Sequence, residues 1–171
     1  MLKNHESKLN WPLKEYNMNI NYIELDNDQI DSIRPLWEKL KEHHRELSPY
    51  FPERYVEFTF SERKEDLLKK SEKGILRVDT AYDETSKQFI GYCISSISDE
   101  KIGEVDSIYL EEKYRSFGIG DILMKRSLDW MDQNSVETKR IMVAAGNENT
   151  LAFYSRYKFF PKHIILEQSN K

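Results

Sequence analysis

The spacing of apolar residues divides the chain into helical and strand-like stretches. Ile20 to Leu25 has the short, β-branched pattern of a strand. From Ile30 to Leu47 apolar residues recur every three or four positions, which predicts an amphipathic helix that Pro35 kinks or whose start it shifts. A second helical stretch is predicted from Glu53 to Ser71 after a proline-rich turn.

From Gly74 onward the pattern changes to a period of two. The predicted strands are Ile75 to Tyr82, Phe89 to Ile97 and Glu104 to Leu110. Short polar turns join them, so an antiparallel meander is expected. A helix then begins near Gly120 and is followed by a strand from Arg140 to Ala145, which predicts a βαβ crossover with parallel neighbours. A last helix, about Asn149 to Tyr157, and a last strand, Phe160 to Glu167, complete the pattern.

Length and composition restrict the class of protein. The 171 residues fit one domain, which we expect to span residues 19–171 behind an N-terminal arm of residues 1–18. Apolar residues make up 39% and charged residues 33%, a globular balance. The single cysteine and the absence of a leader-like or membrane-spanning stretch favour a cytoplasmic protein.

The charge balance bears on the partners. A net charge of −4 argues against a nucleic-acid binder and suits cationic substrates such as amines, although it is also ordinary for solubility. No His or Cys spacing completes a metal site, so His43 and His44 are interpreted as helix-face residues and no metal is expected. Cys93 lies within an apolar run and is interpreted as a core residue.

The stretch from Arg115 to Gly120 lies where a predicted strand ends and a helix begins. Glycines permit close approach of the backbone, and the first amides of a helix lack partners within it, so such a turn can hold a phosphate. A P-loop is excluded because its pattern G-x-x-x-x-G-K-[ST] is absent, and a dinucleotide fingerprint is excluded because Leu123 stands where its third glycine would be. The alternative is that Gly118 and Gly120 only form a tight turn.

Two motifs together identify a family resemblance. The string from Leu110 to Gly120 contains R-x-x-G-x-G, and Asn147 to Tyr154 follows at the right distance, with Phe159 after it. This combination resembles the GNAT superfamily of N-acetyltransferases. The resemblance implies an α/β (α+β) fold with a mixed central sheet of six to seven strands, an antiparallel meander, a βαβ unit and helices on both faces. Two departures are Glu112, where a proline is frequent, and Lys158, where a glycine is usual, so the last helix is expected to end without a glycine cap.

The resemblance also implies a cosubstrate and a site. Acetyl-CoA would bind with its pyrophosphate on the amides of Ser116 to Gly120, with Arg115 at the entrance. The Leu110 amide would contact the acetyl carbonyl. The implied cofactor-binding residues are Ile108, Tyr109, Leu110, Arg115, Ser116, Phe117, Gly118, Ile119, Gly120, Asn147 and Tyr154. Asn147 could equally cap the last helix.

Transfer of an acetyl group to an amine needs a proton acceptor and a proton donor. The resemblance implies that Tyr154 is the acid near the thioester sulfur; the alternative is an ordinary core aromatic. Glu104 and Asp106 lie two apart on one strand and are expected to share a face, either as the base or as a solvated surface. The aromatic residues Tyr50, Phe51, Tyr55, Phe58 and Phe60 are candidates for an acceptor wall or for packing under a loop.

The expected function is N-acetylation of a primary amine on a small molecule or peptide. The alternatives are a protein acetyltransferase acting on a lysine or an N-terminal amine, and a binding module that senses acetyl-CoA without turnover. The expected partners are acetyl-CoA and an amine acceptor, without nucleic acid or membrane, and a homodimer is one further expectation that the family resemblance allows.

Overall fold

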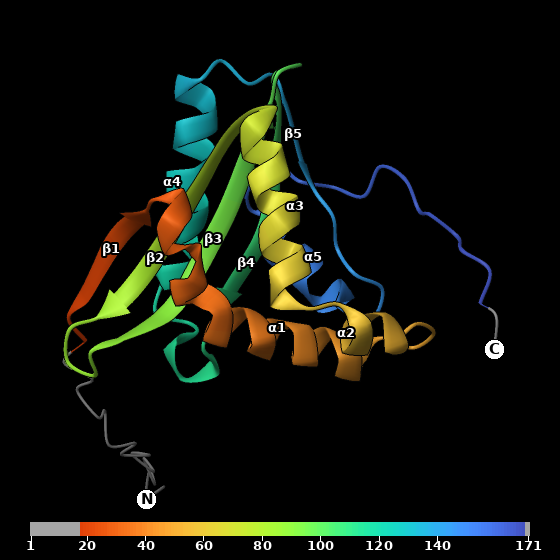
Figure 1. Ribbon diagram of the computed structural model, residues 1–171, viewed down its shortest axis with the longest axis horizontal. Coiled ribbons are helices and arrows are strands. Elements are labelled where there is room, and N and C mark those ends of the chain that lie inside the picture. The colour runs from red at the N-terminus through yellow and green to blue at the C-terminus, as the bar shows by residue number, and fades with distance from the viewer. Residues whose placement is uncertain (1–17, 170–171) are drawn as a thin grey trace, which may run out of the picture.

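The computed structural model describes residues 18–169, which form one five-stranded sheet with helices around it (Figure 1). The predicted arm, apart from Met18, lies outside the described residues. The strands are β1 (Ile20–Leu25), β2 (Gly74–Asp83), β3 (Gln88–Ser98), β4 (Ile102–Leu110) and β5 (Thr138–Ile141). The helices are η1 (Asn27–Ile33), α1 (Arg34–Leu47), α2 (Glu53–Glu57), α3 (Phe60–Glu72), η2 (Glu112–Tyr114), α4 (Ile119–Gln133), η3 (Glu148–Thr150) and α5 (Leu151–Ser155), of which those marked η are 3₁₀ helices.

The sheet has the order β1-β2-β3-β4-β5. Strands β1 to β4 pair antiparallel, which confirms the predicted meander of β2, β3 and β4. Helix α4 then crosses over, and β5 pairs parallel to β4, which confirms the predicted βαβ unit. This parallel pairing is short, because it runs only from Ile102 opposite Thr138 to Val105 opposite Ile141.

The strand count differs from the expected six to seven, because the described residues form five strands. The predicted last strand, Phe160 to Glu167, has no strand partner in the described chain. Its residues Ile164, Ile165 and Leu166 are 85–91% exposed. An apolar, β-branched run favours extended backbone, but a strand also needs a neighbouring edge with which to form hydrogen bonds. The predicted strand Arg140 to Ala145 likewise stops pairing at Ile141.

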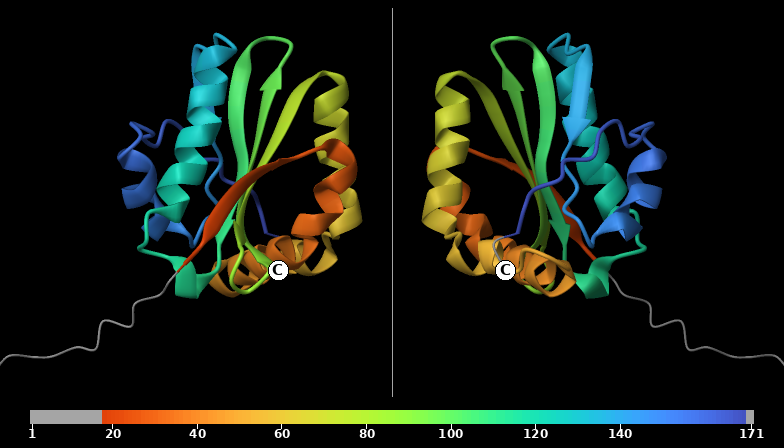
Figure 2. Two further views of the ribbon diagram at one scale, coloured as in Figure 1. Left: turned by 90° about the vertical axis from the view of Figure 1, so that its left-hand side faces the viewer. Right: turned by 90° about the vertical axis from the view of Figure 1, so that its right-hand side faces the viewer.

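Helices cover both faces of the sheet, as expected (Figure 2). On one face a buried cluster joins α4 to the strands, with Leu123, Met124 and Met131 fully buried. On the other face η1, α1 and α3 pack on the sheet through residues such as Ile33, Trp37 and Leu67. Each face of the sheet therefore has its own hydrophobic core, which holds the helices of that face against the strands.

Local sequence signals explain where the helices begin. Pro35 lies in the first turn of α1, where its missing amide proton costs nothing. The single stretch predicted from Glu53 is split, because Thr59 starts a new helix. The Thr59 hydroxyl accepts a bond from the Glu62 amide (3.3 Å), and the Glu62 carboxylate accepts one from the Thr59 amide (2.8 Å), which forms a capping box. No helix within residues 18–169 is long and apolar enough to cross a membrane.

Candidate active site

A groove of about 590 Å³ opens where β4 and β5 diverge. Beyond Val105 and Ile141 the two strands no longer pair, so the second half of β4 presents a free edge toward the segment that follows β5. Ile108, Tyr109 and Leu110 line one wall, and Met142, Val143 and Ala144 line the other. Unpaired strand edges form hydrogen bonds readily with an extended ligand.

The turn before α4 forms one end of the groove. Ser116 and Gly118 have left-handed backbones, with φ of 68° and 79°. The first hydrogen bond of the helix runs from the Ile122 amide to the Gly118 carbonyl (3.1 Å), so the amides just ahead of it have no acceptor within the helix. A Cβ on Gly118 would meet nothing within 4 Å. Glycine is therefore favoured there by the backbone angle, and the space beside it is open.

Arg115 stands at the entrance to this turn. Its Nε donates to the Leu110 carbonyl (3.0 Å), and its guanidinium lies 6.0 Å from the centre of the Tyr109 ring. Arg115 is otherwise exposed and lines the groove. Asp121 in the first helical turn contributes a negative charge nearby, but Arg156 pairs with it at 3.0 Å. This end therefore combines helix amides with arginine side chains, as an anion site does.

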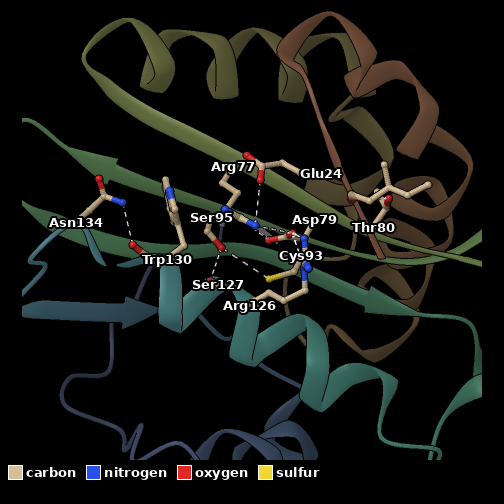
Figure 3. A network of polar contacts seen from close by, with 11 residues as sticks. Glu24, Arg77, Asp79, Thr80, Cys93, Ser95, Arg126, Ser127, Trp130 and Asn134 are labelled. Atoms are coloured by element: carbon tan, nitrogen blue, oxygen red, sulfur yellow. Dashed lines mark hydrogen bonds and ion pairs between the residues drawn. The ribbon is translucent and has the colours of Figure 1, made fainter. Parts of the chain in front are cut away.

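Helix α4, which carries this turn, is tied to the sheet by a buried polar network (Figure 3). The Asp79 carboxylate of β2 is 1% exposed and accepts bonds from Arg77 (2.7 and 3.1 Å) and from Arg126 of α4 (2.7 Å). Beside it, Ser127 of α4 lies 2.5 Å from the hydroxyl of Ser95 on β3. These contacts fix where α4 lies along the strands, and this in turn fixes the position of the turn at its N-terminus.

Tyr154 lies on α5 and lines the groove. It also packs against the core cluster and against Phe153, whose ring centre is 5.4 Å away, so both sequence interpretations describe part of its surroundings. Burial, and to a smaller extent the neighbouring Cys93, raises the pKa of Tyr154 to about 12. Its hydroxyl is thus protonated at neutral pH and is available as a hydrogen-bond donor.

The two candidate carboxylates have different surroundings. Asp106 is the extra residue of a β-bulge, because Ser107 faces Ile94 while Val105 faces Ser95. Asp106 lines the groove, and Ser96 donates to it at 2.5 Å.

Glu104 lies outside the groove, in a separate shallow depression, and Arg140 donates to it at 2.9 and 3.0 Å. Lys70 of α3 contacts both carboxylates, with a direct ion pair to Asp106 and a distance of 3.5 Å to Glu104. The two side chains therefore do meet one cation. Asp106 is among the residues that line the groove, but its side chain is only 1% exposed and is buried against Lys70 and Ser96.

Most of the predicted cofactor-binding residues line this groove, from Ile108 through Gly120 to Asn147 and Tyr154. Phe117 and Ile119 do not: Phe117 is 50% exposed, and Ile119 is buried in the core. The Asn147 side chain makes no capping bond, so the predicted alternative role as a cap is not observed. Within residues 18–169 no cluster of three metal-binding side chains occurs.

None of the five aromatic residues near α2 is among those that line the groove, and two of them pack on Trp37. Phe58 and Phe60 make edge contacts with Trp37, at 5.8 and 5.4 Å between ring centres, and Phe60 is buried. Cys93 is also buried, as expected, and burial raises the pKa of its thiol to about 12. The acceptor role of these aromatic residues stays a prediction, and the groove wall near Asp106 is lined by a different set of residues.

That set comes from α1, whose Leu40, His43 and His44 line the groove near Asp106. The sequence signal for them is the same helical stripe that predicted α1, because Leu40 and His44 belong to its apolar periodicity. Their position in the groove depends on how α1 crosses the sheet, which periodicity alone does not give.

The groove thus has a cationic end with helix amides, a free strand edge, and the largely buried phenol of Tyr154 among its lining residues. An elongated ligand with phosphates at one end and a reactive carbonyl at the other would match this order of groups.

Comparisons with known proteins agree with this geometry. A model of the acetyltransferase (GNAT) family matches residues 37–159. An uncharacterized N-acetyltransferase of Methanocaldococcus jannaschii is 24% identical over 72 residues, which is 42% of this chain and 32% of that relative, so the match spans about a third of its length.

Solved structures share the fold at low identity. The PaiA N-acetyltransferase of Thermoplasma acidophilum, in complex with coenzyme A, has a TM-score of 0.62 at 19% identity and covers 82% of this chain and 89% of its own. The aminoglycoside N-acetyltransferase AAC(6')-Iy, in complex with CoA, has a TM-score of 0.63 at 12% identity and covers 93% and 100%. Because the family model covers well over half of the sequence and the fold agrees with it, this chain belongs to the acetyltransferase (GNAT) family.

Proposed function

We propose that this protein is an N-acetyltransferase that transfers the acetyl group of acetyl-CoA to a primary amine of a small molecule or peptide. The observation that carries the proposal is the continuity of the groove, which joins the turn of Arg115 and Gly118 to the Tyr154 hydroxyl along the free edge of β4. Family membership supports acyl transfer, and the order of groups along the groove supports the choice of acetyl-CoA as the donor.

The cationic end would hold the pyrophosphate. The amides between Ser116 and Gly120 lie at the N-terminal end of α4, which is the positive end of the helix dipole. The Arg115 guanidinium adds a charged hydrogen-bond donor beside them. The free edge of β4, from Ile108 to Leu110, would pair with the amides of the pantetheine arm, with the Leu110 amide at the acetyl carbonyl. Asn147 would contact this arm from the opposite wall.

In the reaction the amine nitrogen bonds to the thioester carbonyl carbon, the carbon–sulfur bond breaks, and the nitrogen loses one proton while the sulfur gains one. Tyr154 is the proposed donor to the sulfur. With a pKa of about 12 it is a weaker acid than a thiol, whose pKa is near ~8.5, so it would act chiefly by hydrogen bonding to the developing thiolate. Of the two predicted bases, Asp106 lines the groove but has a buried side chain that is ion-paired with Lys70, whereas Glu104 is held by Arg140 outside the groove.

Two other functions have sequence support, namely acetylation of a protein amine and sensing of acetyl-CoA without turnover. They differ from the proposal in the step after cosubstrate binding. A sensor would bind acetyl-CoA and release no thiol with any amine. A protein acetyltransferase would release thiol only with a polypeptide acceptor.

The test has two stages. Calorimetry would measure CoA and acetyl-CoA binding, with ATP and NAD as controls; saturation at a hundredfold the dissociation constant should also stabilise the fold by about 2.7 kcal/mol. Thiol release from acetyl-CoA would then be measured with a panel of polyamines, aminoglycosides, lysine-type amines and peptides. No binding of CoA would contradict the whole proposal, and binding without thiol release would contradict transferase activity.

The variant Tyr154→Phe separates the two stages. It keeps the ring and its packing but removes the hydroxyl, so CoA affinity should stay within about twofold while kcat falls roughly 10²-fold. Tyr157→Phe is the matched control, because Tyr157 lies on the same segment and its hydroxyl is bonded to Asp121. Equal loss in both variants would contradict the specific role of Tyr154.

A further inference from the structure

The last turn of α1 is held against the loop after β5. Gly146 has φ of 94°, and a Cβ there would lie 2.0 Å from the Leu47 carbonyl oxygen. The end of α1 and this loop are therefore in direct backbone contact. His44 lies one turn before this contact, and its ring lines the groove that also contains Asp106 and Tyr154. The backbone contact between the end of α1 and the loop after β5 thus fixes the position of His44 beside the groove.

The imidazole of His44 forms no hydrogen bond with any of residues 18–169. Its Nδ1 is the single buried side-chain nitrogen or oxygen, within residues 18–169, that lacks a partner. No bond to the other nitrogen, Nε2, is found among the described residues either, and Nε2 is at least partly exposed on a residue that lines the groove. Buried polar atoms in native proteins are usually satisfied, so an imidazole with two free nitrogens beside a groove requires an explanation.

Three other residues that line the groove, Asp106, Tyr109 and Tyr154, are poorly suited to accept a proton at neutral pH. Asp106 is ion-paired with Lys70 and accepts a bond from Ser96. Tyr109 and Tyr154 have pKa values raised by burial, so their hydroxyls stay protonated. A histidine is the side chain whose ordinary pKa lies closest to the working pH of a general base.

The environment of His44 keeps it uncharged. Burial, and then the neighbouring charge of His43, lowers the pKa of His44 below its ordinary 6.5. Tyr55 of α2 contacts the ring, with 5.6 Å between ring centres. His43 is the charged neighbour that acts on the pKa of the His44 ring. The titratable and charged groups on the elements packed against α1 include Arg54 and Tyr55 on α2, Arg63 and Lys70 on α3, Tyr92 on β3, and Asp106 and Tyr109 on β4.

We propose that His44 Nε2, and neither of the two carboxylates, accepts the proton that the acceptor amine loses during acetyl transfer. The proposal rests on the proposed function and assigns the acceptor subsite to the groove wall made by Leu40, His43 and His44. As the nitrogen–carbon bond forms, the nitrogen proton passes to Nε2, directly or through one water. The imidazolium then returns that proton to solvent. A neutral imidazole also admits an ammonium substrate without repelling it.

The test compares three variants after an accepted amine has been identified with the wild type. His44→Gln should lower kcat/KM roughly 10²-fold and remove the acidic limb of its pH profile, with CoA affinity within about twofold. His43→Gln is the comparison on the same helix and should keep the limb, moved toward higher pH because the charge of His43 no longer lowers the pKa of His44. Asp106→Asn should also keep the limb, because its carboxylate is not the proton acceptor in this scheme.

One measurement does not depend on a folded variant. The pKa of His44 in the wild type, followed by NMR of labelled histidine, should agree within about one unit with the acidic pKa of kcat/KM. Disagreement would overturn the proposal, as would a pH limb that disappears in Asp106→Asn but persists in His44→Gln. A wild type that binds CoA but acetylates no amine would instead overturn the proposed function, and this role with it.

Discussion

The phenol of Tyr114 donates a 2.6 Å hydrogen bond to the Asp83 carboxylate across the core. Asp83 ends β2, and Tyr114 lies directly before Arg115, so the bond fixes the approach to the turn that begins α4. Both residues are buried, at 4% and 5% exposure. Asp83 also accepts bonds from the Thr85 amide (2.9 Å) and the Ser86 hydroxyl (2.8 Å).

This bond predicts how stability depends on acid. The Tyr114 hydroxyl, followed by the Thr85 amide and Ser86, lowers the pKa of Asp83 from 3.8 to about 2. Because the folded-state pKa is the lower one, the contribution is fully present above pH ~4 and is lost as the pH falls toward 2. Urea unfolding of wild type and Asp83→Asn across pH 2–6 should show a gap in free energy that closes in this window. The difference in unfolding free energy between wild type and Tyr114→Phe should also close in this window and should be smaller. A difference between wild type and Asp83→Asn that stays constant with pH would contradict the lowered pKa of Asp83.

Gly118 should be replaceable only by residues that tolerate a left-handed backbone. Gly118→Ala should cost about 1–2 kcal/mol, because φ is 79° while no side-chain clash arises. Gly118→Asn should cost less, since asparagine adopts this conformation more readily. Chemical denaturation checks both. Equal costs would show that the backbone angle is not the reason for glycine at this position.

Removal of the Asp79 carboxylate should strongly destabilise the fold. Asp79→Ala leaves Arg77 and Arg126 without their shared buried partner, and breaking such a pair costs about 3–5 kcal/mol. Glu24→Ala is the control, because Glu24 contacts the same Arg77 at 3.0 Å but is 53% exposed and should cost at most about 1 kcal/mol. Similar effects of the two variants would contradict the importance of burial.

Lys158 should be a site where glycine stabilises the protein. The residue has φ of 65°, and its amide donates to the Ser155 carbonyl at 3.0 Å, so it closes α5 in a left-handed conformation without glycine. Lys158→Gly should raise the free energy of unfolding by about 1 kcal/mol. Lys162→Gly, in an exposed stretch without this backbone angle, should give no gain.

The sequence predicted those features that depend on local periodicity and motif. The strands β1 to β4, the crossover helix α4 and the groove position of Tyr154 follow from alternation, turn residues and the two motifs. The features it missed depend on long-range packing. The split of α2 from α3 follows from the cap at Thr59, and the unpaired Phe160 to Glu167 has no neighbouring edge.

For the candidate site, too, the sequence predicted some of the residues and missed others. Glu104 and Asp106 share one face, as the alternation predicted, because both contact Lys70. The bulge at Asp106 breaks the alternation beyond that residue, and of the two only Asp106 is among the residues that line the groove. Periodicity places His44 on a helix face and no more, because its unpartnered ring is visible only once α1 is packed beside β4.

The free edge of β4 is made of main-chain groups, which every residue except proline supplies alike. Mutation can therefore exchange most side chains along this edge while the peptide groups that face the groove persist. The groove can therefore persist in evolution while most of the side chains around it are replaced. Shared architecture at 12–19% identity is then an expected outcome of drift on a main-chain scaffold, with selection concentrated on the few positions where a side chain or a backbone angle cannot be exchanged.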